Sequence, residues 1–199
     1  MDPATESDEA LLAWVSEPGA FEELYRRHVA KVTAFATRRC ARPHDVPDLV
    51  AAVWLEVIAS SRSFDARKGR ALPWVLGVAA NLTASQARRR ARELDALARL
   101  GREPLLEDEE VGELEARLDA EGPAREVLRA LGELPAGERV VAELVFVEGL
   151  EPADVARALG IRPATARMRL LRARRKLRAS IPSRKSAGDE PVPHLGGTS

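Results

Sequence analysis

Residues 152–178 read PADVARALGIRPATARMRLLRARRKLR, and this stretch decides the fold of the C-terminal part of the chain. Pro152 can open a short helix, because proline is tolerated in the first helical turn. Gly160 can adopt the left-handed backbone conformation that ends a helix, and Pro163 can begin the next one. Two helices joined by so tight a turn predict a helix-turn-helix, whose second helix enters the major groove of DNA.

The second of these helices has two different faces. Its spacing places Ala166, Leu170, Ala173 and Leu177 on an inward face, and Thr165, Met168, Arg169, Arg172, Arg175 and Lys176 opposite. Residues 157–178 hold nine basic side chains and no acidic one. The first turns are expected to meet base edges and the later arginines to neutralise phosphates. The alternative is a solvated cationic helix without a DNA partner. The predicted duplex-binding residues are Arg162, Thr165, Arg167, Met168, Arg169, Arg172, Arg174, Arg175 and Lys176.

The rest of the chain also has helical periodicity. Aromatic residues make up only 4% of the sequence, so the core must consist mainly of Leu, Val and Ala, which favours helices over sheets. Residues 103–121 hold nine acidic side chains against Arg117 alone, which indicates a linker. This linker either lies over a basic surface or is a solvated spacer. We therefore predict an all-α protein with two small helical domains, residues 10–93 and 123–179. An acidic flexible linker, residues 94–122, joins them, and a disordered tail, residues 180–199, follows.

A helix over residues 46–59 is apolar nearly all round. One stripe contains Val50, Val53, Trp54, Val57 and Ile58, and the opposite side carries Leu49, Ala52, Leu55 and Ala59. A helix that is apolar on two faces is usually buried on both. In so small a domain, the second face is expected to dock on another protein. The alternative is deeper burial within its own fold.

The loop that follows combines an aromatic residue with four cations. Phe64 lies among Arg62, Arg67, Lys68 and Arg70. This combination suits an unpaired nucleic-acid base stacked beside neutralised phosphates. Alternatively, Phe64 holds the loop against the core.

Several classes of site are not indicated. Cys40 is the only cysteine, and the three histidines lack ligand-like spacing, so no metal and no cofactor are expected. No nucleophile, base and orienting group occur together, so the chain is not expected to be an enzyme. The N-terminus has no apolar signal core, and no apolar run approaches the length of a membrane span. We expect a cytoplasmic protein without membrane insertion.

Taken in order, several segments resemble bacterial RNA polymerase sigma factors of the extracytoplasmic-function (ECF) type, in the sigma-70 family. The resemblance covers roughly residues 10–179. Residues 20–28, 45–50 with Trp54, 63–74 and 78–81 are similar to sigma region two. Residues 131–135, 148–150, 153–156, 159–161 and 165–177 are similar to sigma region four.

The resemblance implies roles for these segments. Region two would bind the β′ clamp helices of core RNA polymerase and read the minus-ten promoter element, and region four would read the minus-thirty-five element. The polymerase contacts would be Asp48, Leu49, Ala52, Leu55 and Glu56. The single-strand contacts would be Arg62, Phe64, Arg67, Lys68, Arg70, Asn81 and Arg88. The chain departs from the usual family pattern at Ala51-Ala52, Gly77, Ala80 and Ala166.

The predicted function is therefore promoter-specific transcription initiation. The partners would be core RNA polymerase, promoter DNA and an anti-sigma factor. One alternative is a helix-turn-helix regulator that binds an operator without polymerase, which leaves the helix 46–59 and the Phe64 loop without a role. The other is a helical adaptor that binds only protein.

Overall fold

The computed structural model describes residues 2–40, 42–99 and 122–180, and within these ranges it is helical and contains no strand. This confirms the predicted all-α class with two helical domains. Most of the predicted linker and tail lies outside the described residues. The helices are α1 (Asp8–Ala13), α2 (Pro18–Thr37), α3 (Asp45–Ser60), α4 (Ala71–Arg99), α6 (Gly122–Gly132), α7 (Ala136–Ala142), α8 (Pro152–Ala158) and α9 (Pro163–Ser180). Short 3-10 helices, η1 (Pro3–Thr5) and η2 (Ser61–Ser63), and a π-helical segment, η3 (Glu143–Val147), complete the described elements.

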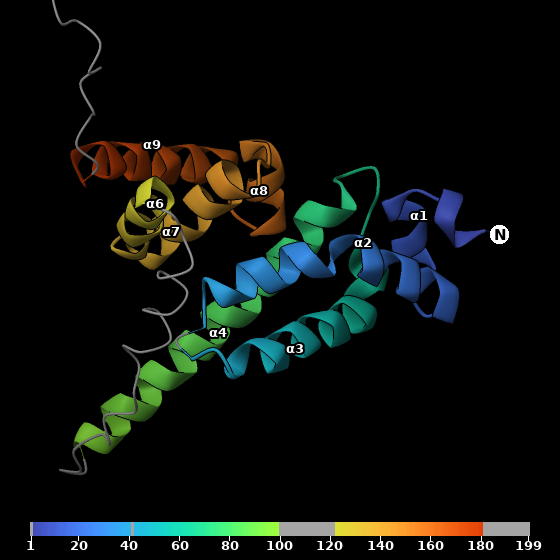
Figure 1. Cartoon of the computed structure of the whole chain (residues 1–199), viewed down its shortest axis with the longest axis horizontal. Coiled ribbons are helices and arrows are strands. Elements are labelled where there is room, and N and C mark those ends of the chain that lie inside the picture. Colours follow the sequence, from blue (N-terminus) through green and yellow to red (C-terminus); the bar gives the residue numbers. More distant parts are fainter. Residues whose placement is uncertain (1, 41, 100–121, 181–199) are drawn as a thin grey trace, which may run out of the picture.

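The N-terminal domain is a bundle of α1 to α4 (Figure 1). Its core is mainly aliphatic, as the scarcity of aromatic residues predicts, although Phe35 and Trp54 are also part of it. Val32 and Phe35 of α2, Val53 of α3 and Leu76 of α4 are fully buried against one another's helices. Each comes from a stripe of apolar residues spaced three or four apart, which explains why the sequence folds into these helices.

Helix α1 is absent from the sequence-based prediction. Ser7 caps its start, because the Ser7 hydroxyl accepts a hydrogen bond from the Ala10 amide at 3.2 Å. Leu11, Leu12 and Val15 are buried in the core of the bundle. The helix has only six residues, fewer than two turns, and follows a polar segment, so its apolar spacing is too short to form a recognisable pattern.

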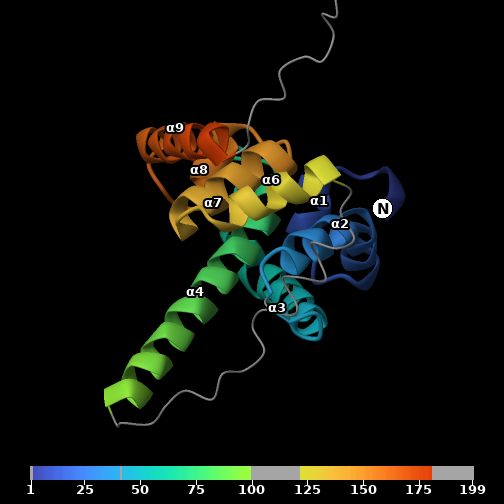
Figure 2. The ribbon, with the colours of Figure 1, turned by 60° about the vertical axis from the view of Figure 1, so that its left-hand side comes forward.

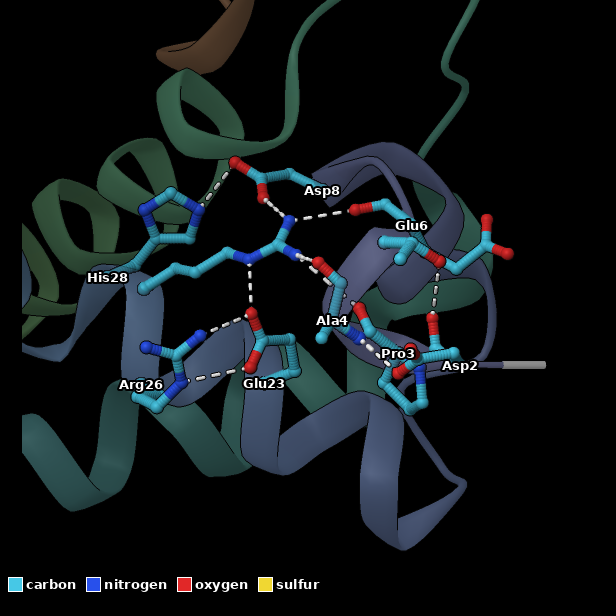
Figure 3. A network of polar contacts seen from close by, with 10 residues as sticks. Asp2, Pro3, Ala4, Glu6, Asp8, Glu23, Arg26 and His28 are labelled. Carbon is cyan, nitrogen blue, oxygen red and sulfur yellow. Dashed lines mark hydrogen bonds and ion pairs between the residues drawn. The ribbon is translucent and has the colours of Figure 1, made fainter.

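Arg27 of α2 ties the first residues of the chain to the bundle (Figure 3). Its Nη1 donates to the Glu6 carbonyl at 2.8 Å and to Asp8 Oδ1 at 2.9 Å, and its Nη2 donates to the Ala4 carbonyl at 2.9 Å. Its Nε donates to Glu23 Oε1 at 2.6 Å. Nη2 also donates to the Pro3 carbonyl at 3.4 Å, so one guanidinium contacts three backbone carbonyls and two carboxylates, which fixes the segment that precedes α1.

Helix α4 begins at the end of the Phe64 loop and continues beyond the predicted domain boundary. The Ala71 amide at its start donates to Glu9 Oε1 at 3.1 Å, so a side chain of α1 caps it. It runs to Arg99, and its distal end projects away from the bundle (Figure 2). The prediction that the linker begins at residue 94 is therefore wrong for residues 94–99. This segment, ELDALAR over residues 93–99, consists mainly of good helix formers, which extend the helix despite their charge.

The C-terminal domain contains the predicted helix-turn-helix, formed by α8 and α9. Gly160 has a φ of 62°, in the left-handed region that favours glycine. The Ile161 amide donates to the Ala156 carbonyl at 2.9 Å, and the Gly160 amide donates to the Arg157 carbonyl at 3.0 Å. This pair of bonds is the Schellman motif that ends a helix in a tight turn. α9 then packs across α7 (Figure 1).

The two domains are in direct contact. α8 packs against α4, and η3 and α7 approach the C-terminal end of α2. The sequence analysis expects two tethered domains and does not anticipate this interface. Its contacts are made by Arg38, Arg39, Arg70 and Gly77 on one side and by Arg139, Glu143, Glu148, Asp154 and Ala158 on the other.

Candidate nucleic-acid and protein interfaces

Helix α9 has the inward face that its spacing predicts. Ala166 and Ala173 are fully buried and Leu170 nearly so, while Leu177 packs against the same core. The exposed side chains are mainly basic. Among the predicted duplex-binding residues, Arg162, Arg167, Met168, Arg172, Arg174 and Arg175 are exposed, and Thr165 is half-buried. A cationic, solvent-facing helix that follows a tight turn has the shape and charge to lie in a DNA groove.

Arg169 and Lys176 of the predicted set also contact α7, and Lys176 is nevertheless exposed. Arg169 is half-buried over Gly137 of α7. Lys176 Nζ forms an ion pair with Glu138 Oε2 at 2.8 Å. Both follow from spacing, because each residue is three or four positions from the buried Ala173 and so shares its side of the helix. Arg174 is exposed, but its guanidinium lies 5.3 Å from the centre of the Phe146 ring.

The loop between α3 and α4 forms a cavity of about 570 Å³. Phe64 lies at one side of it, with its ring centre 5.6 Å from that of Trp74 in an edge-to-face arrangement. Phe64 also packs against the core, so the alternative role as a loop anchor is present in the structure. The lining includes four of the predicted single-strand contacts, namely Phe64, Arg67, Lys68 and Arg70.

Two of the loop cations are oriented by Asp65. Arg67 donates to Asp65 Oδ1 through its side chain at 3.1 Å and through its backbone amide at 3.0 Å, and Lys68 lies 3.3 Å from Oδ2. The hydrogen bonds from Arg67 lower the pKa of Asp65 to about 2. The carboxylate therefore stays charged and holds both cations at the rim of the cavity.

The remaining predicted single-strand contacts lie elsewhere. Arg62 is exposed but does not line the loop cavity. Asn81 and Arg88, one and three turns further along α4 than Gly77, line a second cavity of about 490 Å³ between the domains. Arg39, Arg139 and Arg169 line the same cavity. The structure thus divides the predicted set between two cavities and leaves Arg62 outside both.

The second apolar face of α3 is partly exposed. Leu55 is 68% exposed, which is unusual for a leucine on a helix whose other large apolar residues are mostly buried. Asp48 and Glu56 beside it are exposed, and Ala52 is half-buried. Leu49 is only 4% exposed, so its predicted place on this docking face is wrong. It lies one position before the buried Val50 and four before Val53, which turns it toward the core.

Sequence reasoning missed the part of the loop cavity that comes from the other domain. Asp154, Arg157 and Ala158 of α8 line it, although they are more than 80 residues away from the loop in the chain. No local pattern relates these residues to the loop. One signal was available: Gly77, a glycine in the middle of α4, is buried beneath Ala158.

Two further classes of feature are absent from the described residues. Within the described ranges, no group of three or more His, Cys, Asp and Glu residues is arranged to hold a metal ion. No helix in that part of the chain is long and apolar enough to cross a membrane.

Comparisons with known proteins point to one family. The family model "Sigma-70 region 2" matches residues 24–93, and "Sigma-70, region 4" matches residues 124–177. The chain is 32% identical over 161 residues to RNA polymerase sigma factor CarQ of Myxococcus xanthus, covering 80% of this chain and 87% of that relative. It is 29% identical to the ECF RNA polymerase sigma factor SigE of Mycolicibacterium smegmatis, covering 80% of this chain and 60% of SigE.

Two solved structures share the fold. The sigma factor RpoE in complex with the anti-sigma factor NepR from Bartonella quintana matches with a TM-score of 0.62 and 22% identity, covering 80% of this chain and 95% of RpoE. CnrH in complex with the cytosolic domain of CnrY matches with a TM-score of 0.60 and 24% identity, covering 87% of this chain and 96% of CnrH.

Proposed function

Since this chain belongs to the sigma-70 family of RNA polymerase sigma factors, in its extracytoplasmic-function group, we propose how its surfaces divide the work of promoter recognition. The chain binds core RNA polymerase and directs promoter-specific initiation of transcription. α3 binds the β′ clamp helices of the polymerase. The loop cavity and α4 bind the unpaired minus-ten strand, and α9 reads the minus-thirty-five duplex.

The exposed leucine of α3 is the observation that carries this proposal. Leu55 lies two turns after Asp48 and next to Glu56, and both acids are exposed. An apolar contact flanked by acidic groups favours a partner whose surface is basic. An operator-binding regulator that acts without polymerase has no use for such a face. An adaptor that binds only protein has no use for the arginines of α9.

The loop cavity suits an unpaired base. Phe64 and Trp74 supply aromatic surface, and Arg67, Lys68 and Arg70 supply charge for the flanking phosphates. The chain itself contributes binding and positioning, whereas the polymerase carries out catalysis. We therefore propose that it is not an enzyme, and that it acts in the cytoplasm with the polymerase.

Both solved neighbours are complexes, one of them with a protein described as an anti-sigma factor. We propose that this chain also has a protein partner of that class. Competition between such a partner and core polymerase for the purified chain would identify it.

Transcription in vitro tests the proposed function. Purified core polymerase and the chain are incubated with a library of genomic fragments, and the start sites of the transcripts are mapped. We expect defined start sites that require the chain. A chain that neither binds core polymerase nor directs it to any start site contradicts the proposal.

Salt dependence separates the sigma factor from the adaptor. If α9 neutralises about five phosphates, the affinity for upstream promoter duplex falls with a log–log slope near −4 to −5. An affinity that does not change with salt favours the adaptor.

A further inference from the structure

The second cavity, of about 490 Å³ between the domains, has an excess of positive charge along its walls. Arg39 directly after α2, Arg88 of α4, Arg139 of α7 and Arg169 of α9 all line it. None of the described residues that line it is acidic. Four segments that are far apart in the chain thus bring guanidinium groups to one space, and the protein walls around that space strengthen the positive potential inside it.

The carboxylates near these arginines do not balance their charge. Glu143 is the acidic partner of two of them, because its Oε2 accepts a hydrogen bond from Arg39 Nε at 2.8 Å and its Oε1 accepts one from Arg139 Nε at 2.9 Å. Among the described residues, no carboxylate pairs with the side chain of Arg88 or of Arg169. Four arginines therefore share one carboxylate.

Arg39 shows the electrostatic consequence of this arrangement. Its side chain is only 12% exposed, and its Nη2 is buried without a hydrogen-bond partner among the described residues. Burial lowers the pKa of the Arg39 guanidinium, and the charges of Arg139 and Arg38 lower it further, by more than Glu143 offsets. A buried cation that other cations repel is unfavourable. An anion in the cavity would offset that repulsion.

The rest of the cavity wall is apolar. Leu134, Val140, Leu159 and Ile161 contribute to it, together with several alanines. Small-molecule sites commonly have volumes of about 300–1,000 Å³ and combine an apolar lining with a few charged or polar groups. Arginine binds phosphate groups with two parallel hydrogen bonds. The cavity thus offers arginines to phosphate groups and an apolar surface to an organic group attached to them.

We propose that this cavity is a binding site for a nucleoside polyphosphate, with its phosphates on the arginines and its nucleoside against the apolar wall. Arg39 and Arg139 are recessed, with side chains 12% and 20% exposed, which favours a small ligand over a DNA strand that passes along the surface. Each domain supplies two of the arginines, so the ligand contacts both. The inference goes beyond the proposed function and requires neither polymerase nor promoter.

Titration calorimetry of the purified full chain tests the site. The ligands are ATP and GTP, with pyrophosphate as a probe of the arginines alone and adenosine as a probe of the apolar wall alone. We expect both nucleotides to bind and to raise the melting temperature of the chain. Pyrophosphate should bind roughly 10-fold or more weakly than ATP, because it lacks the apolar contacts. Adenosine should give no measurable heat.

Four variants with the same change of charge locate the binding. Arg88→Gln and Arg169→Gln should each weaken ATP binding roughly 10-fold or more, because each removes a charged donor from the cavity. Arg92→Gln on α4 and Arg172→Gln on α9 are the matched controls, since both residues are exposed and neither lines the cavity. Their ATP affinity should equal that of wild type. Arg88 is also exposed, so Arg88→Gln keeps the test valid even if Arg169→Gln unfolds the chain.

Several results would overturn the proposal. One is the absence of both heat and a melting shift with ATP and GTP at millimolar concentration. Another is an equal loss in all four variants, which would mean that the nucleotide is attracted by net charge alone. Pyrophosphate that binds as tightly as ATP would show that the nucleoside is not recognised. A single-stranded oligonucleotide that binds through Arg88 and Arg169, with no binding of ATP, would assign the cavity to DNA.

Discussion

The guanidinium of Arg169 on α9 lies directly over Gly137 on α7. A Cβ atom at residue 137 would stand 3.2 Å from Arg169 Cζ, so the absence of a side chain there lets the arginine rest on the α7 backbone. Arg169 also lines the cavity between the domains. It packs the helix-turn-helix against its own domain and does not present its charge at the outer face of α9. The sequence pattern places Arg169 and Arg172 on the same outer face of α9, but in the structure Arg169 is half-buried and Arg172 is exposed.

We expect Arg172→Ala to change DNA discrimination and Arg169→Ala to change thermal stability. Arg172 is exposed, so its loss should reduce discrimination between minus-thirty-five duplex and scrambled duplex by about 1–3 kcal/mol if it reads a base edge. Loss of Arg169 should lower thermal stability through lost packing and leave that discrimination nearly unchanged. Fluorescence anisotropy with both duplexes, and thermal unfolding of both variants, measure the difference. Equal loss of discrimination in both variants would show that Arg169 also reaches the groove.

The faces of α9 show how far periodicity can predict a site. Ala166, Leu170 and Ala173 are buried as the sequence indicates. Arg169 and Lys176 lie at the edges of the buried stripe, where their long side chains reach α7, although Lys176 stays exposed. A pattern of apolar residues defines the centre of a face. It does not define the edges, because those depend on what the adjacent helix offers, here Gly137 and Glu138.

Phe64→Ala should weaken binding of the unpaired minus-ten strand. Stacking of a base on an aromatic side chain contributes about 1–3 kcal/mol, so affinity for the oligonucleotide should fall by roughly 5- to 150-fold. Phe146→Ala is a suitable control, because Phe146 is also a partly exposed phenylalanine that lies under an arginine, but in the other domain. Fluorescence anisotropy of a labelled oligonucleotide with wild type and both variants measures the difference. If Phe64 only anchors the loop, its loss lowers the melting temperature and leaves oligonucleotide affinity unchanged.

The contacts of Asp8 with Arg27 and His28, which anchor the N-terminal segment, should make the free energy of unfolding depend on pH in the acid range. Burial alone would raise the pKa of Asp8, but the hydrogen bond from Arg27 and the charges of His28 and Arg27 outweigh it, so the pKa lies below its usual value of 3.8. A carboxylate with a lowered pKa in the folded state stabilises the fold at pH above the unfolded value, and this contribution is lost as pH falls through the folded pKa.

Comparison with Asp8→Asn checks this expectation. Urea unfolding between about pH 3 and pH 7 should show that wild type is more stable than the variant at neutral pH and that the difference shrinks below about pH 4. Asp95→Asn, at an exposed position of α4, should follow wild type throughout. A difference between wild type and Asp8→Asn that stays constant with pH would mean that the Asp8 charge does not stabilise the anchor.

The fold was more predictable than the contacts between its parts. Helices whose apolar stripes run over several turns, such as α2 and α9, are evident because each turn repeats the signal. α1 has too few residues for that, and only the core that Leu11 and Leu12 enter shows its place. The meeting of Arg70 with Asp154 depends on how two domains pack. Arg70 and Asp154 are 84 residues apart in the chain, so no local sequence pattern predicts their contact. Gly77, which lets α8 approach α4 closely, is the one residue whose type indicates the interface.

Leu55→Arg should abolish polymerase binding without unfolding the chain. Leu55 is 68% exposed, so a longer charged side chain fits without disturbing the core. In the complex, the arginine would replace the apolar contact and face the basic partner surface that Asp48 and Glu56 are proposed to bind. Loss of such a contact typically costs about 2–4 kcal/mol, so affinity for core polymerase should fall by roughly 30- to 1,000-fold.

Trp14→Arg is the matched control for this variant, because Trp14 is another large apolar side chain, 54% exposed at the end of α1. Its polymerase affinity should equal that of wild type. Binding is measured with immobilised core polymerase, and circular dichroism confirms that both variants keep their helices. The opposite result, a folded Leu55→Arg chain that binds polymerase normally, would show that another surface makes the contact. Because α9 is far from this substitution in the chain and lies in the other domain, affinity for minus-thirty-five duplex should be unaffected in either case.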